Sequence, residues 1–102
     1  MRVSSRKLRA SANGQECTVR IPDICNYNPE TTVLAHLPCG QKGMGMGMKG
    51  FDTVAVYACS ACHDVIDGRA AGDIDWQDMP RAIAETHEGL IRAGVLTVKG
   101  AA

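Results

Sequence analysis

Apolar and β-branched residues gather in three short stretches of the chain, at residues 17–21, 31–37 and 53–58. In the first stretch apolar and polar positions alternate, which is the period of a β-strand with one buried face. The second stretch is rich in β-branched residues, which favour strands. The pattern predicts three strands, with Leu34 and His36 on the same face of the second one.

Two short helices are predicted to flank these strands. Residues 4–13 form a short basic helix or arm that ends at Gly14. Residues 60–67 follow the third strand. Ser60 can cap this helix at its N-terminus, and Gly68 can end it.

The longest predicted helix lies near the C-terminus and runs from Trp76 or Asp78 to Ala93. Pro80 falls in its first turn and Gly94 follows its end, which is the usual placement of these two residues. Its apolar stripe is expected to consist of Met79, Ile83, His87 and Leu90 or Ile91. We expect the histidine in this stripe to be buried and hydrogen-bonded.

A glycine-rich loop at residues 38–50 separates the second and third strands, and its glycines disfavour regular structure. The chain has 102 residues, which is the length of one ordinary domain. We therefore predict a single α+β domain over residues 1–102. It would comprise a basic segment (1–13), a core (15–68) and a C-terminal helix (76–94).

The formal net charge is zero, but the charges are unevenly distributed. Residues 1–50 hold seven Lys/Arg and three Asp/Glu, whereas residues 51–102 hold four and eight. The basic half could contact phosphates and the acidic half could hold cations, or both could be ordinary solvated surface.

No apolar run approaches the ~20 residues that a membrane-spanning helix needs. The basic residues at the N-terminus precede no apolar segment of the kind found in signal peptides. We therefore expect a cytoplasmic protein without a membrane partner. In that reducing compartment cysteines serve metal binding more often than disulfides.

Four of the five cysteines have a spacing that favours a metal site. Cys59 and Cys62 form a C-x-x-C pair, and Cys17 and Cys25 lie on a strand and the turn after it. Four thiolates can complete a tetrahedral zinc site. The alternatives are two buried cysteines beside a coincidental pair, or a redox pair, although no long βαβ unit surrounds the motif. The fifth, Cys39, is expected to be free.

Two histidines could carry chemistry. His36 ends a predicted strand next to the glycine-rich loop, where a neutral imidazole could take a proton from water. It could equally be a structural histidine bonded to a backbone carbonyl. His63 and Asp67 are four residues apart and share a helix face, so they could bind a divalent cation or simply each other.

The strand–loop–strand–helix order and several short motifs resemble a known family. The residues that carry the resemblance are Arg20-Ile21-Pro22, Cys25-Asn26, Asn28-Pro29-Glu30-Thr31, Val33-Leu34-Ala35-His36-Leu37, Gly45-Met46-Gly47-Met48-Lys49, Asp52 and Ala58-Cys59-Ser60-Ala61-Cys62-His63-Asp64-Val65-Ile66-Asp67. The chain resembles the HNH (ββα-metal) nucleases. It is most similar to the small YbcO-type nucleases of phages and prophages.

The resemblance implies a zinc-stapled ββα-metal core and metal-dependent hydrolysis of DNA phosphodiester bonds. His36 and His63 would be the catalytic residues, as the general base and as a ligand of a catalytic divalent ion (Mg, Mn, Ni or Zn). The zinc cysteines would be Cys17, Cys25, Cys59 and Cys62. The alternative is a non-catalytic zinc module that binds nucleic acid or a protein.

The chain departs from the family pattern at two positions. Ala35 replaces the metal ligand that usually precedes the base, so Asp67 is the candidate second ligand. The middle asparagine has no clear match, and Asp52 is the nearest residue. Phosphate contacts would come from Arg6, Lys7, Arg9, Arg20 and Lys49, each of which could instead be a solvated surface charge.

Overall fold

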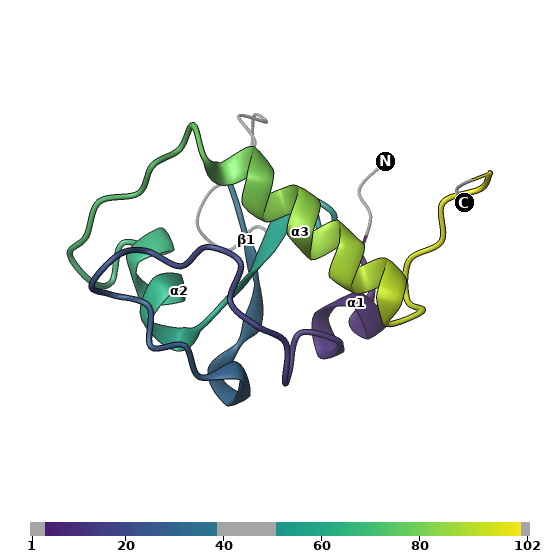
Figure 1. Ribbon diagram of the computed structural model, residues 1–102, viewed down its shortest axis with the longest axis horizontal. Coiled ribbons are helices and arrows are strands. Elements are labelled where there is room, and N and C mark those ends of the chain that lie inside the picture. The colour runs from purple at the N-terminus through teal and green to yellow at the C-terminus, as the bar shows by residue number, and fades with distance from the viewer. Residues whose placement is uncertain (1–3, 39–50, 101–102) are drawn as a thin grey trace.

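The computed structural model of the protein describes residues 4–38 and 51–100 and shows a small α+β fold (Figure 1). Its regular elements are, in order, α1 (Arg6–Ala10), the 3₁₀ turn η1 (Pro29–Thr31), β1 (Val33–His36), β2 (Ala55–Ala58), α2 (Ser60–Ile66) and α3 (Met79–Arg92). The predicted α+β class is therefore confirmed, and the strand–strand–helix order is present in β1, β2 and α2. No helix in the described part of the chain is long and apolar enough to cross a membrane.

The sheet consists of the two antiparallel strands β1 and β2. Leu34 pairs with Tyr57 and His36 pairs with Ala55. Because residues that face each other across a sheet share one of its faces, these four side chains lie on the same side. The second and third predicted strands are thus confirmed, each somewhat shorter than expected.

The prediction of a strand at residues 17–21 is wrong. The chain bends at Thr18 and Val19, and Arg20 has a left-handed φ of 50°. Only one backbone hydrogen bond joins this segment to β2, from the Thr18 amide to the Tyr57 carbonyl at 2.8 Å. The alternating apolar residues at 17–21 form a tight turn around the Cys17 sulfur and not a strand.

Threonine hydroxyl groups form hydrogen bonds with backbone groups of β2 at the edge where a third strand was expected. The Thr86 Oγ1 accepts a hydrogen bond from the Tyr57 amide at 3.0 Å and lies 3.1 Å from the Thr18 Oγ1. Thr86 also donates to the Ala82 carbonyl, so this buried network is satisfied without a strand.

The helix ends follow the predicted signals, with one correction. Gly68 ends α2 with a φ of 77°, and Gly94 follows α3 with the same φ, both in the left-handed region that glycine adopts readily. The N-cap of α2 is Cys59 and not Ser60, because its sulfur accepts a hydrogen bond from the Cys62 amide. Ser60 is the first residue inside that helix.

The buried face of α3 is made of smaller residues than the sequence pattern predicted. Met79 and Leu90 are buried as expected, but Ile83 and His87 are half-buried and Ile91 is exposed. The other buried residues of this helix are Ala82, Thr86 and Gly89. The His87 Nε2 lies 2.8 Å from the Thr53 carbonyl oxygen, which confirms the expectation of a hydrogen-bonded histidine.

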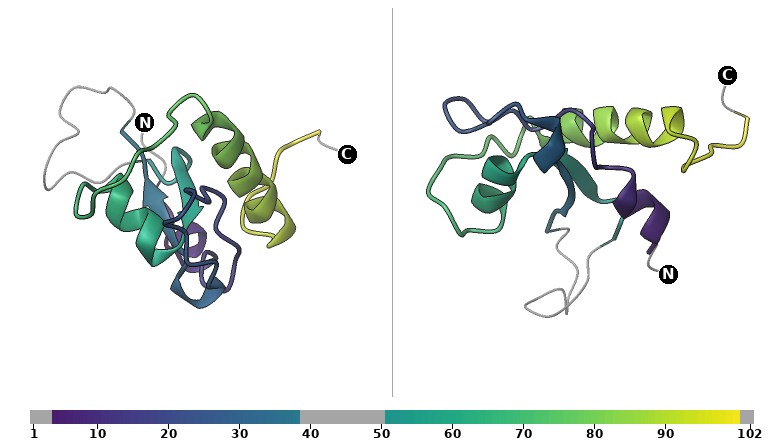
Figure 2. Two further views of the ribbon diagram at one scale, coloured as in Figure 1. Left: turned by 60° about the vertical axis from the view of Figure 1, so that its left-hand side comes forward. Right: turned by 90° about the horizontal axis from the view of Figure 1, so that it is seen from below.

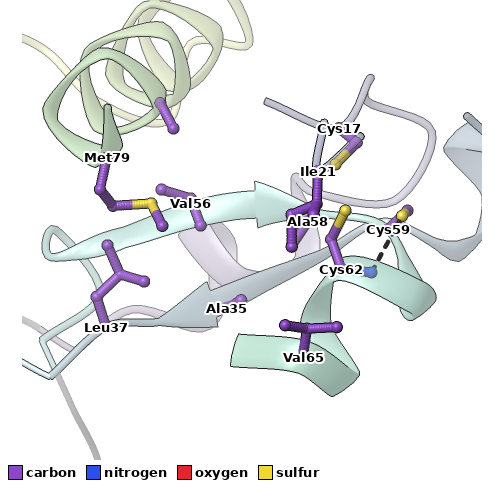
Figure 3. Close-up of a cluster of buried hydrophobic side chains, with 11 residues drawn as sticks. Cys17, Ile21, Ala35, Leu37, Val56, Ala58, Cys59, Cys62, Val65 and Met79 are labelled. Carbon is purple, nitrogen blue, oxygen red and sulfur yellow. Dashed lines mark hydrogen bonds between the residues drawn. The ribbon is translucent and has the colours of Figure 1, made fainter. Parts of the chain in front are cut away.

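Helix α2 covers one face of the sheet and α1 the other, as Figure 2 shows from below, whereas α3 contributes residues to the core clusters on both faces. On one face Ala35 and Val56 pack in one core cluster with Cys62 and Val65 of α2. Figure 3 shows Val65 beneath Ala35 in this cluster. On the other face Leu34 and Tyr57 pack with Leu8 of α1 and Leu90 of α3, together with Ala12 and Ala55. Candidate functional residues on α1 and on α2 therefore belong to opposite faces of the sheet.

Candidate metal cluster and histidine–aspartate site

The four cysteines predicted to bind metal converge at one end of the core, and Figure 3 shows three of them, Cys17, Cys59 and Cys62. Their sulfur atoms, from Cys17, Cys25, Cys59 and Cys62, all lie within 4.8 Å of one another. A tetrahedral zinc–thiolate site with Zn–S bonds of about 2.3 Å has S–S edges of about 3.8 Å. The Cys25 and Cys59 sulfurs are 3.8 Å apart, so the geometry fits a tetrahedral ion of that size.

Two similar turns position these sulfurs. The Cys62 amide donates to the Cys59 sulfur at 3.4 Å, and the Arg20 amide donates to the Cys17 sulfur, also at 3.4 Å. In both turns the amide three residues after a cysteine points at its sulfur. Such N–H groups stabilise a thiolate, and the left-handed Arg20 backbone belongs to the second turn.

The protonation of the cluster is uneven. Burial alone would raise the pKa of Cys59, but hydrogen bonds from the Cys62 and Asn26 amides and from neighbouring thiols lower that pKa to about 7. Burial raises the pKa of Cys25 to about 11, and it raises the pKa of Cys62 as well. Of Cys25, Cys59 and Cys62, Cys59 is therefore the one that most readily supplies a thiolate, and a bound metal would displace protons from the other two.

A second cluster surrounds the carboxylate of Asp52, which is only 1% exposed. The His36 Nε2 lies 2.6 Å from the Asp52 Oδ1. The Arg9 guanidinium contacts the other carboxylate oxygen, Oδ2, at 2.7 Å, and the backbone amide of Ser5 donates to that same oxygen. The His36 side chain is 32% exposed, so a group outside the protein can reach its ring.

These contacts keep Asp52 ionised. Burial alone would raise the pKa of Asp52, but hydrogen bonds from His36 and the Ser5 amide and the charge of Arg9 outweigh that effect and lower the pKa below its ordinary value. Because the folded pKa is below the unfolded one, this carboxylate stabilises the fold above about pH 4. That contribution is lost as the pH falls through the lowered folded pKa.

Replacing Asp52 with asparagine is expected to lower the free energy of unfolding at pH 7 by about 1–3 kcal/mol, because Arg9 and His36 lose a charged acceptor. The gap between the variant and the wild type should narrow below about pH 4, where the wild-type carboxylate becomes protonated. Urea unfolding of both proteins with excess zinc, over the pH range in which both fold, measures this gap. A gap that does not change with pH would contradict the assignment of an ionised Asp52.

The predicted pair His63 and Asp67 is present on α2. The His63 Nε2 and the Asp67 Oδ2 are 3.1 Å apart, and both side chains are about one-third exposed. Arg69 contacts the same Asp67 oxygen at 2.9 Å and also pairs with Asp64. An imidazole and a carboxylate can bind a divalent cation, but the guanidinium already neutralises that carboxylate. The pair fits an ion only weakly.

The two histidines lie on elements that belong to opposite faces of the sheet. His36 shares its face with Leu34 and contacts Asp52, which also binds Arg9, whereas α2, which carries His63, packs on the other face. Within residues 4–38 and 51–100, no hydrogen bond or ion pair joins the two histidine–aspartate pairs.

Ala35 occupies the position where the family resemblance expects a metal ligand. It is fully buried against the residues of α2. The described part of β1 therefore offers no side-chain ligand on the α2 face.

The basic residues predicted to contact phosphate differ in their surroundings. Arg9 is bound to Asp52, and Arg20 forms two hydrogen bonds to Glu85, at 3.0 and 3.2 Å. Arg6 and Lys7 are exposed on α1. The remaining candidate, Lys49, lies outside the described residues, as do Cys39 and most of the glycine-rich loop.

Sequence reasoning did not find the partnership of Asp52 with His36 and Arg9. These residues are 16 and 43 positions away from Asp52, and the glycine-rich loop separates it from His36. One signal was available, since Asp52 is an acidic residue just before the predicted strand at residues 53–58, the next strand after that of His36. A carboxylate at that end of the sheet could have been matched to the histidine.

Comparison with known proteins places this chain in a family. The fold and the two clusters define a small α+β protein with a four-cysteine metal-type site and a partly exposed histidine paired with a buried aspartate. The family model described as "Putative nuclease YbcO" matches residues 6–96, and the chain belongs to this YbcO family.

Individual relatives agree with that assignment. The chain is 46% identical over 93 residues to "Putative nuclease YbcO" of Escherichia coli (strain K12), covering 90% of this chain and 91% of that protein. The same values hold for "Putative nuclease ybcO" of Enterobacteria phage 82. A solved structure, "Structure of a putative bacteriophage protein from Escherichia coli str. K-12 substr. MG1655", matches with a TM-score of 0.62 and 39% identity. This match covers 86% of this chain and 100% of that one.

Proposed function

We propose that this protein is a metal-dependent endonuclease that hydrolyses DNA phosphodiester bonds with His36 as its general base. The observation that carries the proposal is the buried Asp52 carboxylate 2.6 Å from the Nε2 of a partly exposed histidine. This pairing is found in a chain whose relatives are named as nucleases. The HNH type of mechanism is part of this proposal.

In the proposed base, the two ring nitrogens of His36 have different roles. One ring nitrogen of His36 is held by Asp52, and the other can take a proton from a water molecule that attacks the phosphorus. The developing imidazolium is stabilised by the carboxylate at its side, as in hydrolases that combine histidine with aspartate. Asp52 itself stays ionised, since Arg9 and the Ser5 amide compensate its charge.

A catalytic divalent ion would be held by His63 and Asp67 and would stabilise negative charge on the phosphate. Among residues 4–38 and 51–100 these are the two protein ligands at that position, and Arg69 competes for one of them. We therefore propose that the site depends on water and substrate oxygens for the rest of its ligands and has low affinity for the ion. Because α2 packs opposite the His36 face, the scissile phosphate would have to reach both groups around β1, whose one partner strand in the described part of the chain is β2.

The four-cysteine cluster is proposed to hold structural zinc. Its S–S spacing and its complete set of four thiols support zinc over an oxygen-preferring cation. Zinc here would join the irregular segment at residues 17–25 to the start of α2.

DNA contacts are proposed to come from the exposed basic residues of α1. Arg6 and Lys7 are solvent-exposed on the helix that also carries Arg9, beside His36. Phosphate contacts from this helix would direct the backbone of DNA toward the proposed base. Lys49 is proposed to add a further phosphate contact, whereas Arg20 is already engaged with Glu85.

The metal part of the proposal is tested by nicking of supercoiled plasmid in Mg²⁺, Mn²⁺, Ni²⁺ or Zn²⁺. Wild-type protein should nick only with added divalent ion and should saturate at high ion concentration. His63→Ala should lose most of this ion-dependent activity. Asp64→Ala, a matched change on the same helix, should retain it. Equal activity of both variants would show that the catalytic ion does not bind at His63.

A second candidate is a non-catalytic zinc module that binds nucleic acid or protein. Ala35 is buried where a metal ligand would be needed, and the two histidines belong to opposite faces; both observations favour this candidate. It predicts salt-dependent DNA binding with no nicking in any of the four ions.

A further inference from the structure

Asp52 connects three parts of the chain that are distant in sequence. It lies just before β2, it contacts the end of β1 through His36, and it contacts the N-terminal helix through Arg9 and the Ser5 amide. All of these contacts converge on one carboxylate that is almost inaccessible to solvent. A buried charge needs such partners, so the three contacts depend on each other.

The hydrogen bond to Asp52 decides which nitrogen of His36 carries the proton. An ionised carboxylate can only accept hydrogen bonds, so the Nε2 at 2.6 Å must donate an N–H. In a neutral imidazole the other nitrogen then holds the free lone pair. Nδ1 of His36 is therefore the atom that can take a proton from water.

The N-terminal helix is anchored well enough to hold this arrangement. An isolated helix of five residues would be unstable in water. In the protein Leu8 is only 3% exposed and packs in the cluster that includes Leu34 and Tyr57. Ser5 caps the helix by accepting a hydrogen bond from the Leu8 amide. The backbone that carries Arg9 and the Ser5 amide is thus fixed against the sheet.

We propose that Asp52 is a positioning residue for His36, and that α1 completes the site by holding Asp52 through Arg9 and the Ser5 amide. In this arrangement Nδ1 is the basic nitrogen. The N-terminal segment would then be an integral part of the site as well as a basic surface. The catalytic meaning of this inference rests on the proposed nuclease function, but the arrangement itself can be measured without activity.

The direct test is the tautomer of His36 in the wild-type protein, measured by ¹⁵N NMR at a pH above the ordinary imidazole pKa of about 6.5. We expect the Nε2–H form, with an N–H proton that exchanges slowly because Asp52 holds it. His87 provides an internal reference in the same spectrum. A predominant Nδ1–H form of His36 would overturn the inference, whatever the enzymatic activity.

Variants test the role of Asp52 and α1. Asp52→Asn should weaken the Nε2–H preference and speed exchange of that proton, while Asp64→Asn should change neither. Arg9→Met, which leaves Leu8 and the helix in place, should produce a smaller effect in the same direction. If Asp52→Asn does not fold, the wild-type tautomer and Arg9→Met still decide the question. An Nε2–H signal that is unchanged in both variants would overturn the positioning role.

Nicking rates of single and double variants distinguish failure of this inference from failure of the proposed nuclease function. Asp52→Asn should slow nicking by roughly 10–100-fold, the range found when a hydrogen-bond partner that orients a metal-binding imidazole is removed. In a His36→Ala background the same change should have no further effect, because Asp52 acts through His36. Equal effects in both backgrounds would overturn the inference. If the wild-type protein shows the Nε2–H form of His36 but nicks no DNA, the positioning of His36 by Asp52 stands and the nuclease proposal is overturned.

Discussion

Replacing Cys59 with serine is expected to abolish binding of the proposed structural zinc and to unfold the protein. Structural zinc sites have apparent binding free energies of about 10–16 kcal/mol, which is as large as the whole stability of a small domain. The segment from Cys17 to Cys25 has no regular structure that could hold it in place without the ion. Serine is itself a good helix N-cap, so the substitution removes the metal ligand and keeps the start of α2 capped.

Zinc content by elemental analysis and thermal unfolding followed by circular dichroism measure this effect. Cys39→Ser is the matched control, since it removes a cysteine that is not one of the four in the cluster. This control should keep both its zinc and its folding transition. A Cys59→Ser protein with normal stability, or a wild-type protein without zinc, would contradict the assignment of a structural zinc site.

Replacing His36 with alanine is expected to reduce DNA nicking by roughly 10²–10⁴-fold, the usual range for losing a general base. The fold should survive, because the His36 ring is partly exposed and the main packing of β1 comes from Leu34 and Ala35. Asp52 would lose one hydrogen bond but would keep Arg9 and the Ser5 amide. The loss should therefore appear in the hydrolysis rate and not in the zinc content.

His87→Ala is the matched histidine control for this variant. His87 is also half-buried and hydrogen-bonded, but its partner is a backbone carbonyl and not a carboxylate. Its removal should leave the nicking rate within a few-fold of wild type. If both histidine variants lost activity equally, the loss would reflect damage to the fold.

The metal cluster and the last helix could be predicted from the sequence because their signals are local. A C-x-x-C pair fixes the separation of two sulfurs within one turn, and Cys59 and Cys62 do occupy one turn at the start of α2. Pro80 and Gly94 mark the two ends of α3 through their own backbone preferences.

The parts that could not be predicted depend on tertiary contacts. The alternation at residues 17–21 resembles a strand, but hydrogen bonds to the Cys17 sulfur and to β2 convert it into a turn. The buried face of α3 is made of Ala82, Thr86 and Gly89 together with Met79 and Leu90. Gly89 permits the close approach of the Tyr57 ring, since an added Cβ at this position would lie 2.7 Å from it. Only the folded chain reveals this close approach.

In the candidate site, too, the residues with local sequence signals could be predicted and those that depend on tertiary contacts could not. His36 could be identified from its place at the end of a strand, and His63 with Asp67 from helical spacing. The Asp52 partnership requires two elements to meet across the glycine-rich loop, and the placement of α2 requires knowing which face of the sheet it covers. Neither follows from residue spacing along the chain.

The central claim is tested most directly by plasmid nicking with wild-type and His36→Ala proteins that are purified in parallel and matched in zinc content. Both are incubated with the same supercoiled DNA and the same divalent ion, and the initial rates are compared. The account predicts ion-dependent nicking by the wild type that is at least about a hundredfold faster than that of the variant. Equal rates for the two proteins, or no nicking by the wild type in any of the four ions, would contradict it.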